Sequence, residues 1–420
     1  MLLSLIAVSV VLAGWSLLAR RLESWRLTAP MVLVLAGIAV GFATRDQVAA
    51  SLNTDAAEHI AEVILAILLF VDATDVRGGL FGREPRSALR VLFIVMPLCL
   101  GAALLLGLWL LPGLSWAVLL IIACIVVPID FAPATSILRD ERIPERVRNL
   151  LNVEAGYNDG IVSPIFIFAL VLAGEGGDAE NPLAALGSAV PQAIKAILVG
   201  LAVGAALAVL SNAADRRGLM TEHSKRWLLV AAPLIAFGLS LGVDGNGFVA
   251  AFVCGLALRN LRHSANIGRE LELVDDVGFL LAVGMWFVFG AAAVVALQSG
   301  VSIGMVVFCL LALTAVRVVP MLIGLLGSRP NWRERWLLGA LGPRGTTSIV
   351  FGLLAFNTLS DTAEHEVLLA MVVTVLGSVV LHGLGAPAVA RAHARSGGQE
   401  HSAPGRLGAA GRSGATGELD

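Results

Sequence analysis

The residues of this sequence most able to do chemistry are carboxylates that lie within long apolar segments. One such segment holds Glu154, Asn158 and Asp159 and continues to Ser163. On a helix, Glu154 and Asn158 share one face, while Asp159 and Ser163 share a neighbouring face. Because a carboxylate binds either a proton or a hard cation, the pattern predicts an ion site centred on Asp159, with Asn158 and Ser163 as further ion-binding residues.

A second carboxylate, Asp130, lies between two prolines in the preceding apolar segment. Pro128 and Pro133 each remove a backbone donor and clash with the preceding turn. The helix is therefore expected to be kinked or unwound at Asp130. The carbonyl groups and half-helix ends freed there can coordinate an ion, so Asp130 is a second predicted ligand of the cation.

A matching interruption occurs in the second half of the chain, where Gly342, Pro343, Arg344 and Gly345 follow one another. Paired interruptions in two halves are the best sequence indication of a transporter site built from inverted repeats. We therefore predict two inverted repeats of six helices, joined by one linking helix, with discontinuous helices that cross at the middle of the membrane. Arg344 either sets the electric field at the second break or caps its exposed carbonyl groups, and the residues alone leave both roles open.

Buried ionisable residues also have a structural interpretation. A charge at the centre of a bilayer costs at least about 2.5–3.5 kcal/mol, so a single Asp or Arg there often only fastens two helices together. Glu154 fits this interpretation best, as a structural ion pair with Arg317. Five such residues with two helix breaks favour a functional cavity instead. Lys195 is expected to extend to the membrane interface, and Asp244 is expected to lie in a loop.

The composition requires a membrane environment. Of the 420 residues, 57% are hydrophobic and 14% are charged, and the mean hydropathy is +0.86, far above that of soluble domains. Apolar segments long enough to cross a bilayer as helices occupy almost the whole chain and leave no room for a soluble catalytic domain. We predict an all-α polytopic membrane protein with thirteen transmembrane helices that is not an enzyme. The expected helices are 2–19, 29–43, 57–74, 88–111, 114–138, 147–173, 184–210, 227–241, 245–260, 274–297, 301–326, 334–358 and 365–389.

The basic residues indicate the side of the membrane that each loop faces. Lys and Arg occupy every second predicted loop, whereas the other loops carry Arg45 and the acidic stretches 175–180 and 361–366. Because basic loops remain in the cytoplasm, we predict an inner-membrane protein with its N-terminus outside and its C-terminus in the cytoplasm. The segment 391–420 is rich in Gly, Ala, Ser and Arg and is predicted to be a disordered cytoplasmic tail.

The segment from Glu154 to Asp159 is similar to the signature Glu-(Ser/Ala)-x-x-Asn-Asp on the sixth span of a known family. In this respect the chain resembles the bacterial NhaP-like sodium/proton antiporters of the monovalent cation:proton antiporter-1 family. The resemblance covers about residues 1–390, and shorter matches occur at 69–72, 246–250, 289–291 and 342–345. It implies that Asp159 carries the cation or the proton, that Asn158 is its structural neighbour, and that Asp130 is the carboxylate of the crossed-helix span.

The same resemblance implies a homodimer that works by an elevator-like movement in the lipid bilayer. The dimerisation part would comprise about 1–74 and 184–297, and the core part about 88–173 and 301–389. Glu154 would pair with Arg317, and the Asn-Asp form of the signature goes with electroneutral exchange. The expected partners are monovalent cations, protons, lipid and a second copy of the chain. No cofactor and no nucleic acid are expected.

The sequence departs from the family pattern in two places. Ile129-Asp130-Phe131 stands where the family has Thr-Asp-Pro, and Ala155 stands where a serine is common. Both differences remove a possible oxygen ligand. The residues therefore leave open whether the cation is Na⁺, Li⁺ or K⁺, and a potassium/proton antiporter of the same fold is an alternative.

Competition between a cation and a proton for Asp159 is itself an antiport mechanism. If only the neutralised forms of the site cross the dry barrier, each cation is coupled to one proton, which suits a role in pH homeostasis. Asp72 is expected to line the cytoplasmic approach. Two membrane aspartates also occur in intramembrane aspartyl proteases, but the Gly-x-Gly-Asp context of those enzymes is absent here. A channel would need a continuous lined pore instead of paired helix breaks.

Overall fold

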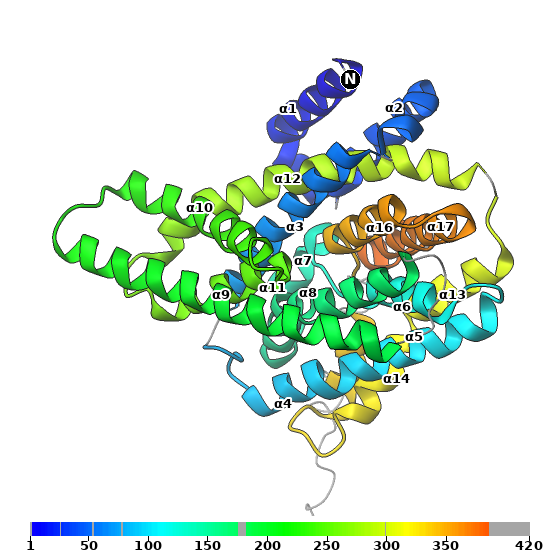
Figure 1. Ribbon diagram of the computed structural model, residues 1–420. Helices are drawn as coiled ribbons and strands as arrows, with labels where there is room; N and C mark the ends of the chain where they lie inside the picture. The colour runs from blue at the N-terminus through cyan, green and yellow to red at the C-terminus, as the bar shows by residue number, and fades with distance from the viewer. Residues whose placement is uncertain are drawn as a thin grey trace, which may run out of the picture.

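The computed structural model describes residues 2–25, 27–52, 54–76, 79–174, 182–298 and 300–385. All regular structure within these ranges is helical (Figure 1), which confirms the all-α class for the described part of the chain. The predicted cytoplasmic tail, 391–420, and the acidic stretch 175–180 lie outside the described residues.

The helices follow the predicted apolar segments in order along the chain. The first group comprises α1 (Leu2–Ser24), α2 (Ala29–Leu52), α3 (Asp55–Asp75), α4 (Pro85–Arg90), the π-helical turn η1 (Val91–Val95), α5 (Met96–Leu110), α6 (Trp116–Val126), the 3₁₀ turn η2 (Ala132–Ala134), α7 (Ser136–Arg139) and α8 (Glu145–Gly174). The second group comprises α9 (Pro182–Arg216), α10 (Glu222–Leu241), α11 (Gly247–Leu261), α12 (Ile267–Leu297), α13 (Ile303–Leu313), α14 (Ala315–Gly324), α15 (Trp332–Ala340), α16 (Thr346–Thr358), α17 (Asp361–Ser378) and the π-helical turn η3 (Val379–Leu384).

Many of these helices are suited to a bilayer by length and composition. Among the described residues, seven are long and apolar enough to cross it, namely Pro85–Leu110, Glu145–Ala173, Leu186–Arg216, Glu222–Leu241, Ile267–Leu297, Ile303–Gly324 and Thr362–Gly383. Four shorter apolar helices accompany them, namely Ala29–Thr44, Trp116–Val126, Gly247–Leu261 and Thr346–Thr358. The chain is therefore a multi-pass membrane protein, while the number thirteen, the inverted repeats and the orientation of the termini stay predictions.

Two of the short apolar helices end or begin at the predicted interruptions. Helix α6 ends at Val126, two residues before Pro128, and the chain resumes helical structure only in η2, whose first turn contains Pro133. Helix α15 ends at Ala340 and α16 begins at Thr346, with Pro343 between them. Proline cannot donate the backbone hydrogen bond that would continue either helix, so both ends follow from the sequence.

Two charged residues outside the breaks lie on the surface. Asp244 is in the short connection between α10 and α11, as predicted, and adopts a positive φ of 55°. Lys195 is exposed on α9.

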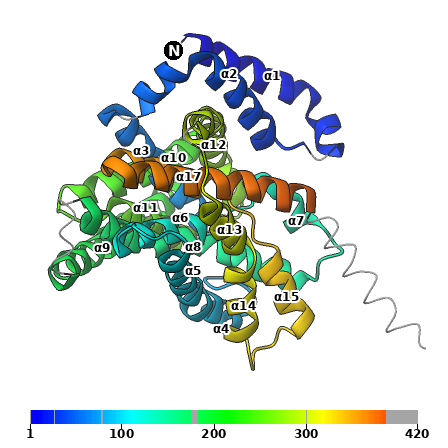
Figure 2. The same cartoon turned by 90° about the vertical axis from the view of Figure 1, so that its right-hand side faces the viewer.

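Helices α2 and α12 approach each other closely at facing small residues. Figure 2 shows α1 and α2 at one end of the molecule, with α12 beside them. A methyl group added at Gly290 would lie 3.0 Å from the Cα atom of Gly37, and one added at Gly41 would lie 3.0 Å from the Cα atom of Ala291. In lipid, such small residues let helix backbones pack directly against each other, because van der Waals contact and not hydrophobic burial drives association there.

Gly290→Ala should therefore lower the free energy of unfolding by about 1–3 kcal/mol, since the added methyl group overlaps the backbone of α2. Gly284→Ala on the same helix is the matched control, because a methyl group there meets no atom within 4 Å. Alanine at that position should leave stability unchanged or raise it, given its better helix propensity. Thermal unfolding of the purified protein in detergent measures both variants, and equal unfolding temperatures for the two would contradict this packing.

Candidate functional site

Asp130 joins the two helix breaks. Its backbone N–H donates to the Pro343 carbonyl oxygen at 2.8 Å. Its carboxylate accepts two backbone hydrogen bonds, one from Ala132 at 2.7 Å and one from Thr346 at 2.5 Å. Thr346 is the first residue of α16, so the negative charge of Asp130 lies at a helix N-terminus, where the unsatisfied N–H groups and the helix dipole favour an anion.

Arg344 also joins the two breaks, but its side chain reaches from the second break back to the first. Its Nε atom donates to the Val126 carbonyl oxygen at the end of α6 at 2.6 Å, and one Nη atom donates to the Gly342 carbonyl oxygen at 2.8 Å. Its backbone N–H donates to the Ser378 hydroxyl at 2.6 Å. The side chain is 1% exposed. Of the two roles left open by the sequence, the structure shows the capping of exposed carbonyl groups, with a cation at a helix C-terminus.

Asp159 lies on α8 beside these breaks and is 3% exposed. Its Oδ2 atom accepts a hydrogen bond from the Thr347 hydroxyl at 2.6 Å. Its Oδ1 atom is buried and has no hydrogen-bond partner among the described residues. One oxygen of the carboxylate is thus held, and the other is left for a ligand.

Asn158 fastens α8 to the first break. Its Nδ2 atom donates to the Ile129 carbonyl oxygen at 2.7 Å, and its Oδ1 atom accepts from the Asp159 backbone N–H at 2.7 Å. Both polar ends of the amide are therefore used in fixing the position of Asp159 relative to the unwound segment.

A cavity of about 230 Å³ reaches this carboxylate. It brings Asp72, Asp130 and Asp159 together, three residues that the sequence analysis selected from separate segments. The complete lining is Asp72, Asp75, Ile129, Asp130, Phe131, Ala132, Thr135, Leu138, Asn152, Ala155, Gly156 and Asp159. The mixture of carboxylates and backbone next to a helix break suits a small cation.

Other predicted site residues lie outside this lining. Ser163 is fully buried and its hydroxyl donates to the Gly160 carbonyl oxygen of its own helix at 3.3 Å. Pro128 and Pro133 bound the first break without lining the cavity. Both prolines lie near the helix ends that position Asp130.

The Glu154 side chain turns away from the cavity toward Arg317 on α14. The two Nη atoms of Arg317 donate to the two carboxylate oxygens at 2.5 and 2.9 Å, and one of them also donates to the Leu338 carbonyl oxygen at 3.0 Å. Glu154 is 6% exposed and Arg317 is 2% exposed. This two-bond geometry satisfies both charges in the interior.

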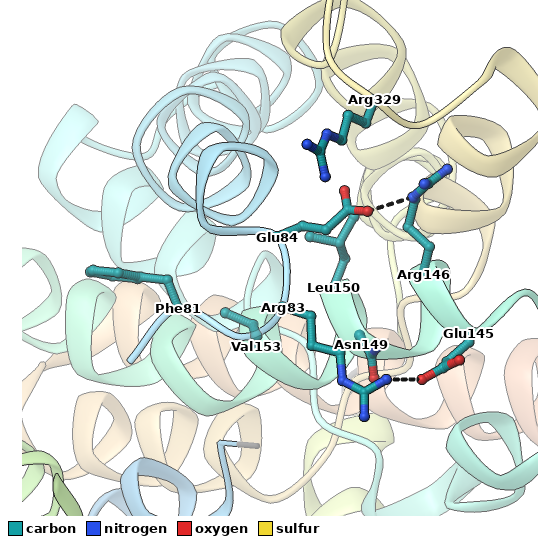
Figure 3. Close-up of a pocket in the computed structure, with 9 residues that line it drawn as sticks. All are labelled: Phe81, Arg83, Glu84, Glu145, Arg146, Asn149, Leu150, Val153 and Arg329. Atoms are coloured by element: carbon teal, nitrogen blue, oxygen red, sulfur yellow. Dashed lines mark hydrogen bonds and ion pairs between the residues drawn. The ribbon is translucent and has the colours of Figure 1, made fainter. Parts of the chain in front are cut away.

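A second and larger cavity, of about 310 Å³, lies at the first turn of α8 (Figure 3). Both carboxylates in its lining are paired. Glu145 accepts from Arg83, and Glu84 accepts from Arg146 at 2.6 Å. Because its acidic groups are already neutralised, this cavity offers no free carboxylate to a cation, and the smaller cavity at Asp159 is the candidate site.

The direct partner of Asp159 was not predicted from the sequence. Thr347 follows the second break and is 3% exposed, yet no role was assigned to it. The signal was present in the run Thr346-Thr347-Ser348, since hydroxyl side chains directly after a helix break in a membrane segment need partners.

Comparison with known proteins assigns the chain to a family. The family model described as "Sodium/hydrogen exchanger, transmembrane" matches residues 7–392. A Na⁺/H⁺ antiporter of Saccharomyces cerevisiae is 23% identical over 326 residues, which are 73% of this chain and 32% of that protein. The chain thus matches only about a third of the length of this yeast relative.

Bacterial and archaeal proteins match over more of their own length. The K⁺/H⁺ antiporter NhaP2 of Shewanella sp. MR-4 is 25% identical over 401 residues, which are 92% of this chain and 67% of that protein. The solved structure of the sodium proton antiporter MjNhaP1 from Methanocaldococcus jannaschii at pH 8 superposes with a TM-score of 0.74 at 19% identity, covering 91% of this chain and 99% of that one. At this identity the likeness shows a shared fold.

The buried ion pair yields a stability prediction. Glu154→Gln or Arg317→Met alone should lower the free energy of unfolding by about 3–5 kcal/mol, because each leaves one buried charge without its partner. The two changes combined should be less destabilising than either one. The control is Glu145→Gln, which removes a pair whose side chains are 68% and 62% exposed and should cost about 0–1 kcal/mol.

Thermal unfolding in detergent compares these four variants. A double variant less stable than both single variants would show that the pair contributes something other than mutual neutralisation.

Proposed function

The chain belongs to the sodium/hydrogen exchanger family, and on that basis we propose that it exchanges a monovalent cation for a proton across the cytoplasmic membrane. The cation is Na⁺, or else K⁺ or Li⁺. The protein is a transporter and not an enzyme. We further propose that it acts as a homodimer with a role in pH homeostasis.

The observation that carries this proposal is the unpartnered Oδ1 atom of Asp159. A buried carboxylate oxygen without a hydrogen bond is costly, so this position calls for a positively charged ligand. The cavity beside it can deliver either a cation or a proton. The two ligands cannot occupy one oxygen together, and their exchange at that oxygen is the chemical core of antiport.

Coupling follows from the cost of moving a bare charge. An ionised and empty Asp159 would have to pass through a low-dielectric barrier, whereas the protonated and the cation-bound forms are neutral. Only these two forms then change sides, so one cation moves for each proton and the exchange is electroneutral. The movement is an elevator-type displacement of the core part, about 88–173 and 301–389, against the dimerisation part.

We propose that ions reach the cavity from the side of its lining residue Leu138. Leu138 directly precedes Arg139, which belongs to a predicted cytoplasmic loop, and Asp72 also lines the cavity. The carboxylates of Asp72 and Asp75 raise the local concentration of cations and disfavour anions. The cavity is thus the proposed cytoplasmic entrance.

Two residues of the cavity lining that could help to select between Na⁺ and K⁺ have no oxygen in their side chains. Ala155 and Ile129 both border the cavity, and neither supplies a hydroxyl group. A potassium/proton antiporter is the second candidate, favoured by the match over 92% of this chain to a K⁺/H⁺ antiporter. An intramembrane aspartyl protease is not supported, because both oxygens of Asp130 bind backbone N–H groups of the breaks.

Asp159→Asn should abolish exchange, since an amide neither releases a proton nor neutralises a cation. The measurement is the recovery of a pH-sensitive dye in everted vesicles after addition of Na⁺, Li⁺, K⁺ or Rb⁺ in turn. Asp244→Asn is the matched control, because Asp244 is an exposed loop residue, and it should retain full activity. Equal membrane levels of both variants are checked by immunoblot. Cation-dependent recovery by Asp159→Asn at the wild-type rate would contradict the proposed function.

A further inference from the structure

We infer that Thr347 is a positioning residue of the cation site, which holds one oxygen of Asp159 so that the other remains available to the cation. This inference rests on the proposed function. It assigns a specific role to a hydroxyl group that neither touches the cavity nor belongs to the acidic motif.

The contact itself is short and buried. The Thr347 hydroxyl donates to the Oδ2 atom of Asp159 at 2.6 Å, and the two residues are 3% exposed each. Asp159 lines the cavity, whereas Thr347 does not. The hydroxyl therefore holds the carboxylate from outside the cavity lining, and Oδ1 is the oxygen left for the incoming ion.

The backbone around Thr347 is fixed on both sides. The N–H of Thr346 donates to Asp130 at 2.5 Å, and the hydroxyl of Ser348 donates to the Ile125 carbonyl oxygen at 2.7 Å. Three successive residues at the start of α16 thus bind three different segments of the chain. This arrangement restricts the movement of the Thr347 hydroxyl, which therefore holds the Asp159 carboxylate in a fixed position.

Orientation matters because the terminal torsion of an aspartate is soft. The carboxylate plane turns over a broad range unless its oxygens are held. Without the Thr347 hydroxyl, Oδ2 would be buried beside an apolar group, and the carboxylate would turn to recover contact with water or with a neighbouring donor. Each such turn moves Oδ1 from the place where the cation binds. Since α8 and α16 both fall in the predicted core part, the contact is kept while the core moves, so the rate of movement itself is unaffected.

The experiment measures exchange in proteoliposomes at one fixed alkaline pH as a function of cation concentration. Thr347→Val should raise the half-saturating concentration of the cation by about tenfold, the effect expected for one hydrogen bond to a charged group, with the maximal rate within about twofold of wild type. Thr347→Ser keeps the hydroxyl and should remain within about twofold of wild type in both quantities.

Thr358→Val is the matched control. It carries the same change on the same helix, at an exposed residue whose hydroxyl donates to the Leu354 carbonyl oxygen of its own helix. Its half-saturating concentration should equal that of wild type. If Thr347→Val does not fold, Thr347→Ala and Thr347→Ser give the same comparison with and without a hydroxyl.

Two outcomes overturn the inference. One is a Thr347→Val or Thr347→Ala protein with the wild-type half-saturating concentration, and the other is a fall in maximal rate alone. Both leave the proposed function intact, because the wild-type protein is active in the same assay. A wild-type protein without any cation-dependent exchange would instead contradict the proposed function itself.

Discussion

The ends of the two broken helices cap each other, and the rest of the site depends on this mutual capping. Helix α6 ends in carbonyl groups that lack a next turn, and α16 begins with N–H groups that lack a preceding one. In the apolar part of a membrane no water satisfies such groups, so protein must do it. Arg344 of the second break binds the Val126 carbonyl oxygen of the first helix, and Asp130 of the first break binds the Thr346 N–H of the second. Each break is stable only in the presence of the other.

This reciprocal capping, with the Glu154–Arg317 pair, determines which carboxylate oxygen is left without a partner. Glu154 is neutralised by Arg317, and the charge of Asp130 is used at the start of α16. Of these three acidic residues, Asp159 is the one with a buried oxygen that has no partner among the described residues. Because the other carboxylate oxygens of these residues have partners, the demand for a positive ligand falls on the Oδ1 atom of Asp159. In the proposed mechanism, the cation and the proton compete for this atom from the side to which the cavity opens.

Much of the architecture was predictable because prolines and charges have strong local consequences in lipid. Pro128, Pro133 and Pro343 predicted the ends of α6 and α15, and the cost of a buried charge led to Glu154 and Arg317 as partners. Other features depend on how separate helices meet. Helical spacing put Ser163 on the face of Asp159, yet Thr347 on another helix makes the contact, because spacing along one helix carries no information about a neighbouring one. The use of both Asp130 oxygens by backbone N–H groups was likewise not visible, since it requires the two breaks to be in register.

The account claims that a cation binds at the free oxygen of Asp159. The most direct test is anomalous diffraction from crystals soaked in Tl⁺, a heavy monovalent cation, at alkaline pH. The account predicts one strong anomalous peak in the cavity beside the Oδ1 atom of Asp159, and no peak there at acidic pH, where the proton occupies the carboxylate. A peak elsewhere in the chain with none beside Asp159, or a peak of equal height at both pH values, would contradict it.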